Sequence, residues 1–150
     1  MTFNKKIKVI NIVITTLYVF ILMFVLFFYR LFVSPVIIPY KINIVPFNTI
    51  MWYINSLLNE SINFNIIIKN IFGNILMFIP MGFYLPLYFK NINNYQKTIK
   101  YSLFVILIIE VGQFVLRAGV FDVDDIILNT LGCLIGYTVC RWYNKICKKG

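Results

Sequence analysis

Three of the chain's five acidic residues fall within one short stretch, FDVDDIILN at 121–129. Asp122, Asp125 and Asn129 follow the spacing i, i+3, i+7, which places side chains on one face of a helix, and Asp124 lies beside them. Such oxygen-rich sets bind polar ligands or a hard cation. We therefore take all four as candidate ligand-binding residues, and Asp122 and Asp125 as candidate ligands for Mg²⁺.

Two further polar sets have helical spacing. Glu110, Gln113 and Arg117 repeat the i, i+3, i+7 pattern, and Asn70 and Asn74 lie four residues apart. All five are candidate ligand-binding residues. Glu110 is the candidate catalytic residue, because a carboxyl group in an apolar segment needs a partner or stays protonated.

Several kinds of catalysis are excluded by residues that the chain lacks. It contains no histidine, and its cysteines, Cys133, Cys140 and Cys147, are spaced by seven residues. On a helix, successive sulfurs at that spacing lie roughly 10 Å apart along the axis, too far for one disulfide or one metal ion. Acyl transfer by a Ser–His or Cys–His pair is excluded. Whether the chain catalyses any reaction is left open.

The composition predicts an integral membrane protein. Of 150 residues, 61% are hydrophobic and 13% are charged, and the mean hydropathy is +0.85. A soluble domain of this length cannot bury so much apolar surface, so membrane lipids must cover the rest. The net charge of +9 does not indicate nucleic-acid binding, because the basic residues flank apolar runs rather than alternate with aromatic residues.

The apolar runs predict one all-α domain over 1–150 with four transmembrane helices. Each run approaches the ~20 residues that span a bilayer. We place the spans at about 9–29, 66–88, 101–120 and 125–142.

The basic residues predict the orientation of these helices. The connection 90–100 holds three lysines and no acid, and the tail after Arg141 holds Lys145, Lys148 and Lys149. By the positive-inside rule, both termini and this connection are cytoplasmic. The connection between the first two helices is long and lies outside, and its part 47–58 forms a short helix that is either interfacial or re-entrant. All three polar sets then lie in the outer half of the bundle and predict an outward-facing pocket.

Purely structural roles also remain open. Asp122 and Asp125 can stabilise a helix start, and Gly132 and Gly136 have the small-xxx-small spacing of closely packed helices. The amide side chains can form hydrogen bonds between helices. Glu110 can pair with Arg117 of a neighbouring copy, or with another helix.

These motifs, in this order, resemble the VanZ-like family of membrane proteins. The matching stretches are VPFNTI (45–50), NIFGNILMFIPMGFYLP (70–86) and EVGQFVLRAGVFDVDDIILNTLGCLIGY (110–137), which lie within about two-thirds of the chain. The motif positions are Asn70, Gly73, Asn74, Pro80, Gly82, Glu110, Gln113, Arg117, Asp122, Asp124, Asp125 and Asn129.

The resemblance implies a role in the cell envelope. The family is named for a protein that lowers susceptibility to teicoplanin, a lipid-tailed glycopeptide antibiotic that targets cell-wall precursors. This implies a site at the outer face of a bacterial cytoplasmic membrane, and the Ile/Asn/Lys bias suggests a Gram-positive source. The resemblance assigns no catalytic residue.

We expect the outer pocket to bind the drug, lipid II or a surface polymer, with Arg117 holding a phosphate or carboxylate. The alternative is an intramembrane enzyme acting on a lipid or polyprenyl phosphate, in which Glu110 is the acid or base and Asp122, Asp125 and Asn129 bind Mg²⁺. A transporter is a third hypothesis, although four helices are few for one unless the protein forms a homo-oligomer.

Overall fold

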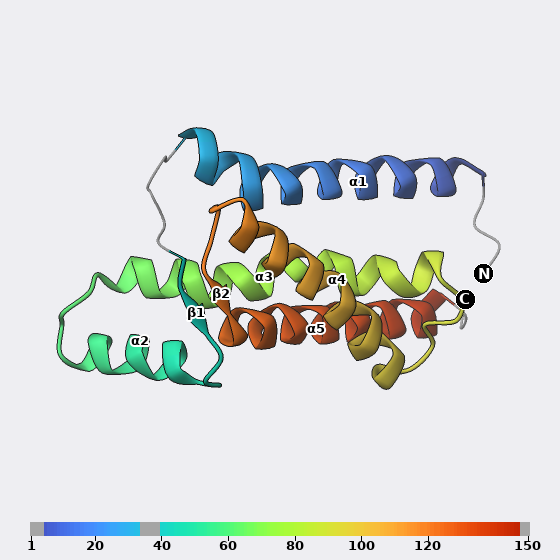
Figure 1. Cartoon of the computed structure of the whole chain (residues 1–150). Helices are drawn as coiled ribbons and strands as arrows, with labels where there is room; N and C mark the ends of the chain where they lie inside the picture. The colour runs from blue at the N-terminus through green and yellow to red at the C-terminus, as the bar shows by residue number, and fades with distance from the viewer. Residues whose placement is uncertain (1–4, 34–39, 148–150) are drawn as a thin grey trace.

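The computed structural model describes residues 5–33 and 40–147 and is built almost entirely of helices (Figure 1). Within these residues, four helical segments are long and apolar enough to cross a membrane, which confirms the predicted all-α fold. They are α1 (Lys5–Met23) with its π-helical continuation η1 (Phe24–Val33), α3 (Phe64–Tyr88), α4 (Tyr95–Val115) and α5 (Val123–Cys147). Lys148 and Lys149, used above to predict orientation, lie outside the described residues.

Short polar side chains cap three of the helix starts. Asn63 accepts a hydrogen bond from the N–H of Asn65 at the start of α3, and Asn94 accepts one from Lys97 at the start of α4. Asp122 accepts one from the N–H of Asp124 at 2.9 Å and so caps α5. These bonds satisfy backbone donors that have no partner within their own helix.

Helix α4 ends at Val115 rather than near Val120, because the chain turns there. The N–H of Ala118 bonds to the carbonyl of Gln113 at 2.8 Å, and the N–H of Arg117 bonds to that of Phe114 at 3.2 Å. This pair of bonds is a Schellman motif, and Arg117 occupies its left-handed position with φ 55°. The prediction that Arg117 continues the helical stripe of Glu110 is therefore wrong.

Glycines let α3 and α5 pack backbone to backbone. A Cβ on Gly82 would lie 1.9 Å from the carbonyl oxygen of Cys133, and one on Gly136 would lie 1.9 Å from that of Ile79. Gly132 is similarly tight. The close helix packing predicted for Gly132 and Gly136 is confirmed, and it holds α3 and α5 together along much of their length.

The two connections that were predicted to lie outside meet at one end of the bundle. Strand β1 (Ile42–Asn43) pairs in parallel with β2 (Phe121–Asp122), with Asn43 opposite Asp122. Helix α2 (Asn48–Leu58) follows β1 and runs antiparallel to the first part of α3 (Figure 1). Residues 47–58 thus form the predicted helix, aligned with the long helices rather than across their ends.

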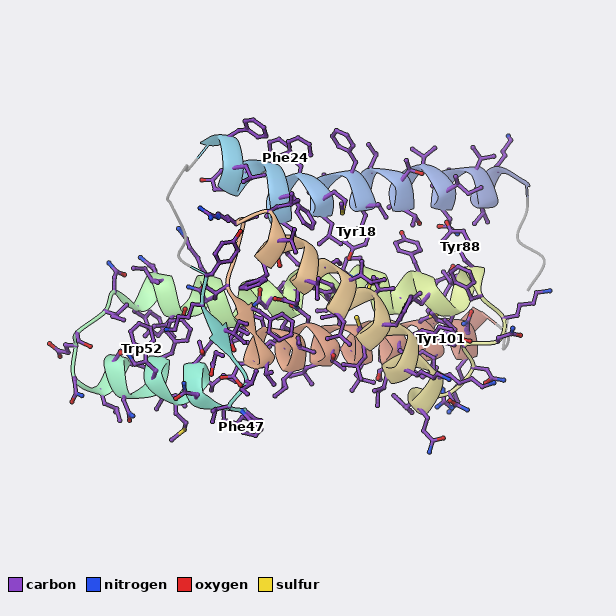
Figure 2. All side chains as sticks on the ribbon, in the orientation of Figure 1. Tyr18, Phe24, Phe47, Trp52, Tyr88 and Tyr101 are labelled. Carbon is purple, nitrogen blue, oxygen red and sulfur yellow. The ribbon has the colours of Figure 1, made fainter. Side chains whose placement is uncertain are left out.

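Helix α1 is joined to the other helices by a small number of contacts. The hydroxyl of Tyr18 donates to the carbonyl of Met77 at 2.8 Å, and Figure 2 shows Tyr18 between α1 and α3. Leu22, Leu26 and Phe78 belong to the buried core, whereas large side chains such as Phe20 stay exposed. Apolar side chains on the outer faces of these helices suit contact with lipid rather than with water.

The close approach of α3 and α5 gives a test. The substitution Gly136→Ala should lower the apparent melting temperature of the purified protein in detergent, because overpacking of this kind typically costs about 1–3 kcal/mol. Gly73→Ala is the matched control on α3, since its added Cβ would meet nothing within 4 Å. Equal melting temperatures for the two variants would contradict the described packing.

Candidate functional site

The start of α2 is held by a carboxylate from another helix. Asp124 Oδ1 accepts from the N–H of Phe47 at 2.5 Å, and Asp124 Oδ2 accepts from Thr49 and Ile50 at 2.8 and 3.0 Å. Helix α2 has no side-chain cap of its own, and Phe47 is left-handed with φ 64°. Asp124 is fully buried. Through these three bonds its carboxylate, which belongs to α5, caps the start of α2.

Asp122 joins the same connections through side chains. Its Oδ2 accepts from Thr49 Oγ1 at 2.6 Å, and its Oδ1 accepts from Asn43 Nδ2 at 3.1 Å. Asn43 also donates to Thr49 Oγ1 at 2.8 Å. Asp122 therefore caps α5, as predicted, and also links β1, α2 and α5. We call Asn43, Thr49, Asp122 and Asp124 the aspartate cluster.

Two pairs of polar residues lie further along the helices. Asn74 Nδ2 of α3 donates to Asp125 Oδ1 of α5 at 2.5 Å, and Asn129 Nδ2 of α5 donates to Glu110 Oε1 of α4 at 3.3 Å. Glu110 is only 3% exposed. These pairs show that the predicted stripes of α3, α4 and α5 do converge, and that each forms hydrogen bonds to a neighbouring helix.

Not every buried polar atom at and next to Asn129 makes a hydrogen bond within the described residues. Within the described residues, Asn129 Oδ1 and Thr130 Oγ1 are buried without a hydrogen-bond partner. Such atoms are costly in an apolar interior. Asn129, which also bonds to Glu110, therefore keeps an unsatisfied acceptor beside that carboxyl group within the described residues.

Gln113 and Asn70 do not join these groups. Gln113 Nε2 donates to the carbonyl of Leu26 at 3.1 Å and so ties α4 to η1. Asn70 Nδ2 donates to the carbonyl of Ile66 in its own helix at 2.8 Å. The structure therefore gives Gln113 a packing role, and the hydrogen bond of the Asn70 side chain stays within α3.

Arg117 is exposed and stacks on an aromatic ring. Its guanidinium carbon lies 4.5 Å from the centre of the Tyr40 ring, a cation–π geometry. The Tyr40 ring in turn packs edge-on against Phe114 at 5.2 Å. Among the described residues, no carboxylate forms an ion pair with Arg117. The bond from Asn129 joins Glu110 to another helix, whereas a pair between Glu110 and Arg117 of a neighbouring copy stays a prediction.

The two candidate metal ligands have different partners. Asp122 bonds to Asn43 and Thr49, whereas Asp125 bonds to Asn74. Over the described ranges 5–33 and 40–147, no three His, Cys, Asp or Glu side chains converge in a way that could hold a metal ion. The arrangement gives no support for a Mg²⁺ site at Asp122 and Asp125.

Three residues of this region escaped the sequence analysis. Asn43, Thr49 and Tyr40 contact site residues that lie more than 70 positions away in the chain. The stretch VPFNTI at 45–50, which contains Thr49, was the available signal. This stretch matched a family motif, but nothing in its residue spacing indicated that Thr49 contacts Asp122.

The fold and these contacts define a small multi-pass membrane protein with carboxylates and amides gathered toward one end of its helix bundle. Residues 13–144 match the VanZ/LLP1 family, and the chain belongs to that family. It is similar to Protein VanZ of Enterococcus faecium, with 32% identity over 77 residues, or 51% of this chain and 47% of the relative. The match thus spans about half the length of that curated relative. No solved structure matches the chain.

The capping of α2 by Asp124 can be tested by amide hydrogen exchange. Asp124→Ala leaves three backbone donors without their acceptor, at a cost of about 1–3 kcal/mol each when buried. Amides at the start of α2 should exchange about tenfold faster or more, while those of α3 stay protected. Glu60→Gln, an exposed carboxylate after the other end of α2, should leave exchange unchanged. Normal protection of α2 in Asp124→Ala would contradict the cap.

Proposed function

We propose that this protein lowers bacterial susceptibility to lipid-tailed glycopeptides of the teicoplanin type. It acts from the outer face of the cytoplasmic membrane, where the surface around Arg117 engages the drug, a cell-wall precursor or a surface polymer. Membership of the VanZ/LLP1 family and the similarity to Protein VanZ support this role. The observation that carries the proposal for the site is the backbone conformation of Arg117.

Arg117 occupies a position at which glycine is the favoured residue. A non-glycine residue in the left-handed region costs on the order of 1 kcal/mol or more, and the Schellman position is usually glycine. The side chain gives little packing in return, because it is exposed, and Tyr40 supplies its one aromatic contact within the described residues. Binding of a ligand by the Arg117 side chain would explain why arginine, and not glycine, occupies this position.

The chemistry of the guanidinium group indicates the ligand class. Its planar set of N–H donors matches a carboxylate or phosphate in bidentate geometry. Stacking on Tyr40 orients the group and leaves its edge free for such a bond. Both anions occur in the expected ligands, as peptide carboxylates and as the phosphates of lipid-linked precursors.

The aspartate cluster then shapes the site instead of binding the ligand. Asp122 and Asp124 are buried and bonded within the protein. They fix the start of α2, where Phe47 and Trp52 remain more than half exposed. These aromatic side chains supply an apolar surface near α2 that suits a lipid tail.

The substitution Arg117→Gly separates function from folding. Because glycine adopts the left-handed conformation without the steric cost of a Cβ, the variant should be at least as stable as the wild type. Cells carrying it should nevertheless lose protection against a lipid-tailed glycopeptide, as measured by the minimum inhibitory concentration at matched protein abundance. Arg141→Ala is the matched control, since Arg141 stacks on Tyr95 at the other end of the bundle. Full protection by Arg117→Gly, or equal protection against a glycopeptide without a lipid tail, would overturn the proposal.

Glu110→Gln distinguishes this proposal from the enzyme alternative. The amide can still accept the bond from Asn129 Nδ2 and has nearly the same shape, so protein abundance should be preserved. A binding surface at Arg117 predicts that protection is also preserved. Loss of protection at normal abundance, read from susceptibility assays and membrane immunoblots together, would instead favour a catalytic carboxyl group at Glu110.

A further inference from the structure

A second candidate site lies at the end of the bundle opposite the aspartate cluster. A cavity of about 510 Å³ opens where α3 ends and α4 begins. This volume falls within the range of about 300–1,000 Å³ that is usual for small-molecule sites. Most of the residues that line it are aromatic or aliphatic. Two of these residues, Tyr88 and Tyr101, are labelled at this end of the bundle in Figure 2.

Apolar side chains from the end of α3 and from α4 form the walls of the cavity. Phe89 follows α3, and Tyr101 and Phe104 lie three residues apart on α4, which places them on one helix face. Phe89 and Phe104 are 59% and 64% exposed in the isolated chain. Tyrosine is enriched at membrane–water interfaces, and Tyr88, which also lines the cavity, is the last residue of α3.

The connection between α3 and α4 gives this cavity a fixed, positively charged rim. The N–H of Ile92 bonds to the carbonyl of Phe89 at 2.9 Å, and the side chain of Ile92 is buried, so the connection is anchored. Lys90 and Asn91 line the cavity beside these apolar walls. Lys90 lies in this connection, and Lys97 and Lys100 follow in the first turns of α4, with no acidic residue over 89–101.

We propose that this cavity binds one anionic phospholipid. The ammonium group of Lys90 and the amide of Asn91 contact the lipid phosphate, and an acyl chain lies along Tyr101 and Phe104. A basic rim beside an apolar wall between transmembrane helices is the arrangement that recognises anionic headgroups. The charge complementarity excludes a second copy of this chain as the favoured occupant, because a second basic rim would be repelled.

The test uses the purified full-length protein in an uncharged detergent, with bound lipid measured by native mass spectrometry. The probes are phosphatidylglycerol, which is anionic, and phosphatidylcholine, which has no net charge, with identical acyl chains, so the two lipids differ only in the headgroup. Wild-type protein should bind phosphatidylglycerol about fivefold more tightly, the equivalent of the ~1 kcal/mol expected for one basic residue beside an anionic lipid. Lys90→Gln should remove this preference.

Two further variants and one further probe make the outcome decisive. Lys145→Gln removes an exposed lysine in the last turn of α5, outside the cavity lining, and should keep the preference. Phe104→Ala should weaken both lipids alike, because it removes part of the apolar wall. Glycerol 3-phosphate, which lacks acyl chains, should not bind. Equal binding of the two lipids, equal effects of Lys90→Gln and Lys145→Gln, or binding of glycerol 3-phosphate as tight as the lipid would each overturn the proposal.

Discussion

The architecture around the candidate site depends on one buried carboxylate. Where the chain leaves β1 and turns into α2, Phe47 is left-handed and three backbone N–H groups have no partner within α2. Each such donor, when buried without an acceptor, costs about 1–3 kcal/mol. Asp124 satisfies all three from the start of α5, so an irregular chain segment can sit beside transmembrane helices. Together with the bonds from Asn43 and Thr49 to Asp122, it fixes the place of α2 and of the strand pair.

A second constraint sets the position of Asp124 itself. The glycines of α3 and α5 bring the two backbones into contact, which leaves little freedom for one helix to slide along the other. The same register places Asn74 beside Asp125 near the start of α5. Polar bonds and glycine packing therefore act on the same helix pair. The polar bonds alone would contribute modestly, because hydrogen bonds between transmembrane helices average well under 2 kcal/mol.

Hydropathy predicted the four long helices well. It measures how apolar each segment is, and an apolar segment of this length must be covered by lipid. Helical spacing also predicted that Glu110 and Asn129 would face neighbouring helices. Neither signal could find Asn43 or Thr49, since these side chains satisfy partners that are distant in sequence. The end of α4 was missed for a related reason. A helix normally stops in this way at glycine, and the chain has Arg117 there.

The bonds of the aspartate cluster also bear on the proposal that an anion binds beside this acidic region. Free aspartates beside Arg117 would repel a phosphate or carboxylate ligand and would compete for the guanidinium group. Asp122 and Asp124 instead direct their oxygens toward backbone and side-chain donors of β1 and α2. These donors offset much of the negative charge, and burial keeps it away from the surface. The exposed charge that dominates the surface at the turn after α4 is then the cation of Arg117, held in place by Tyr40.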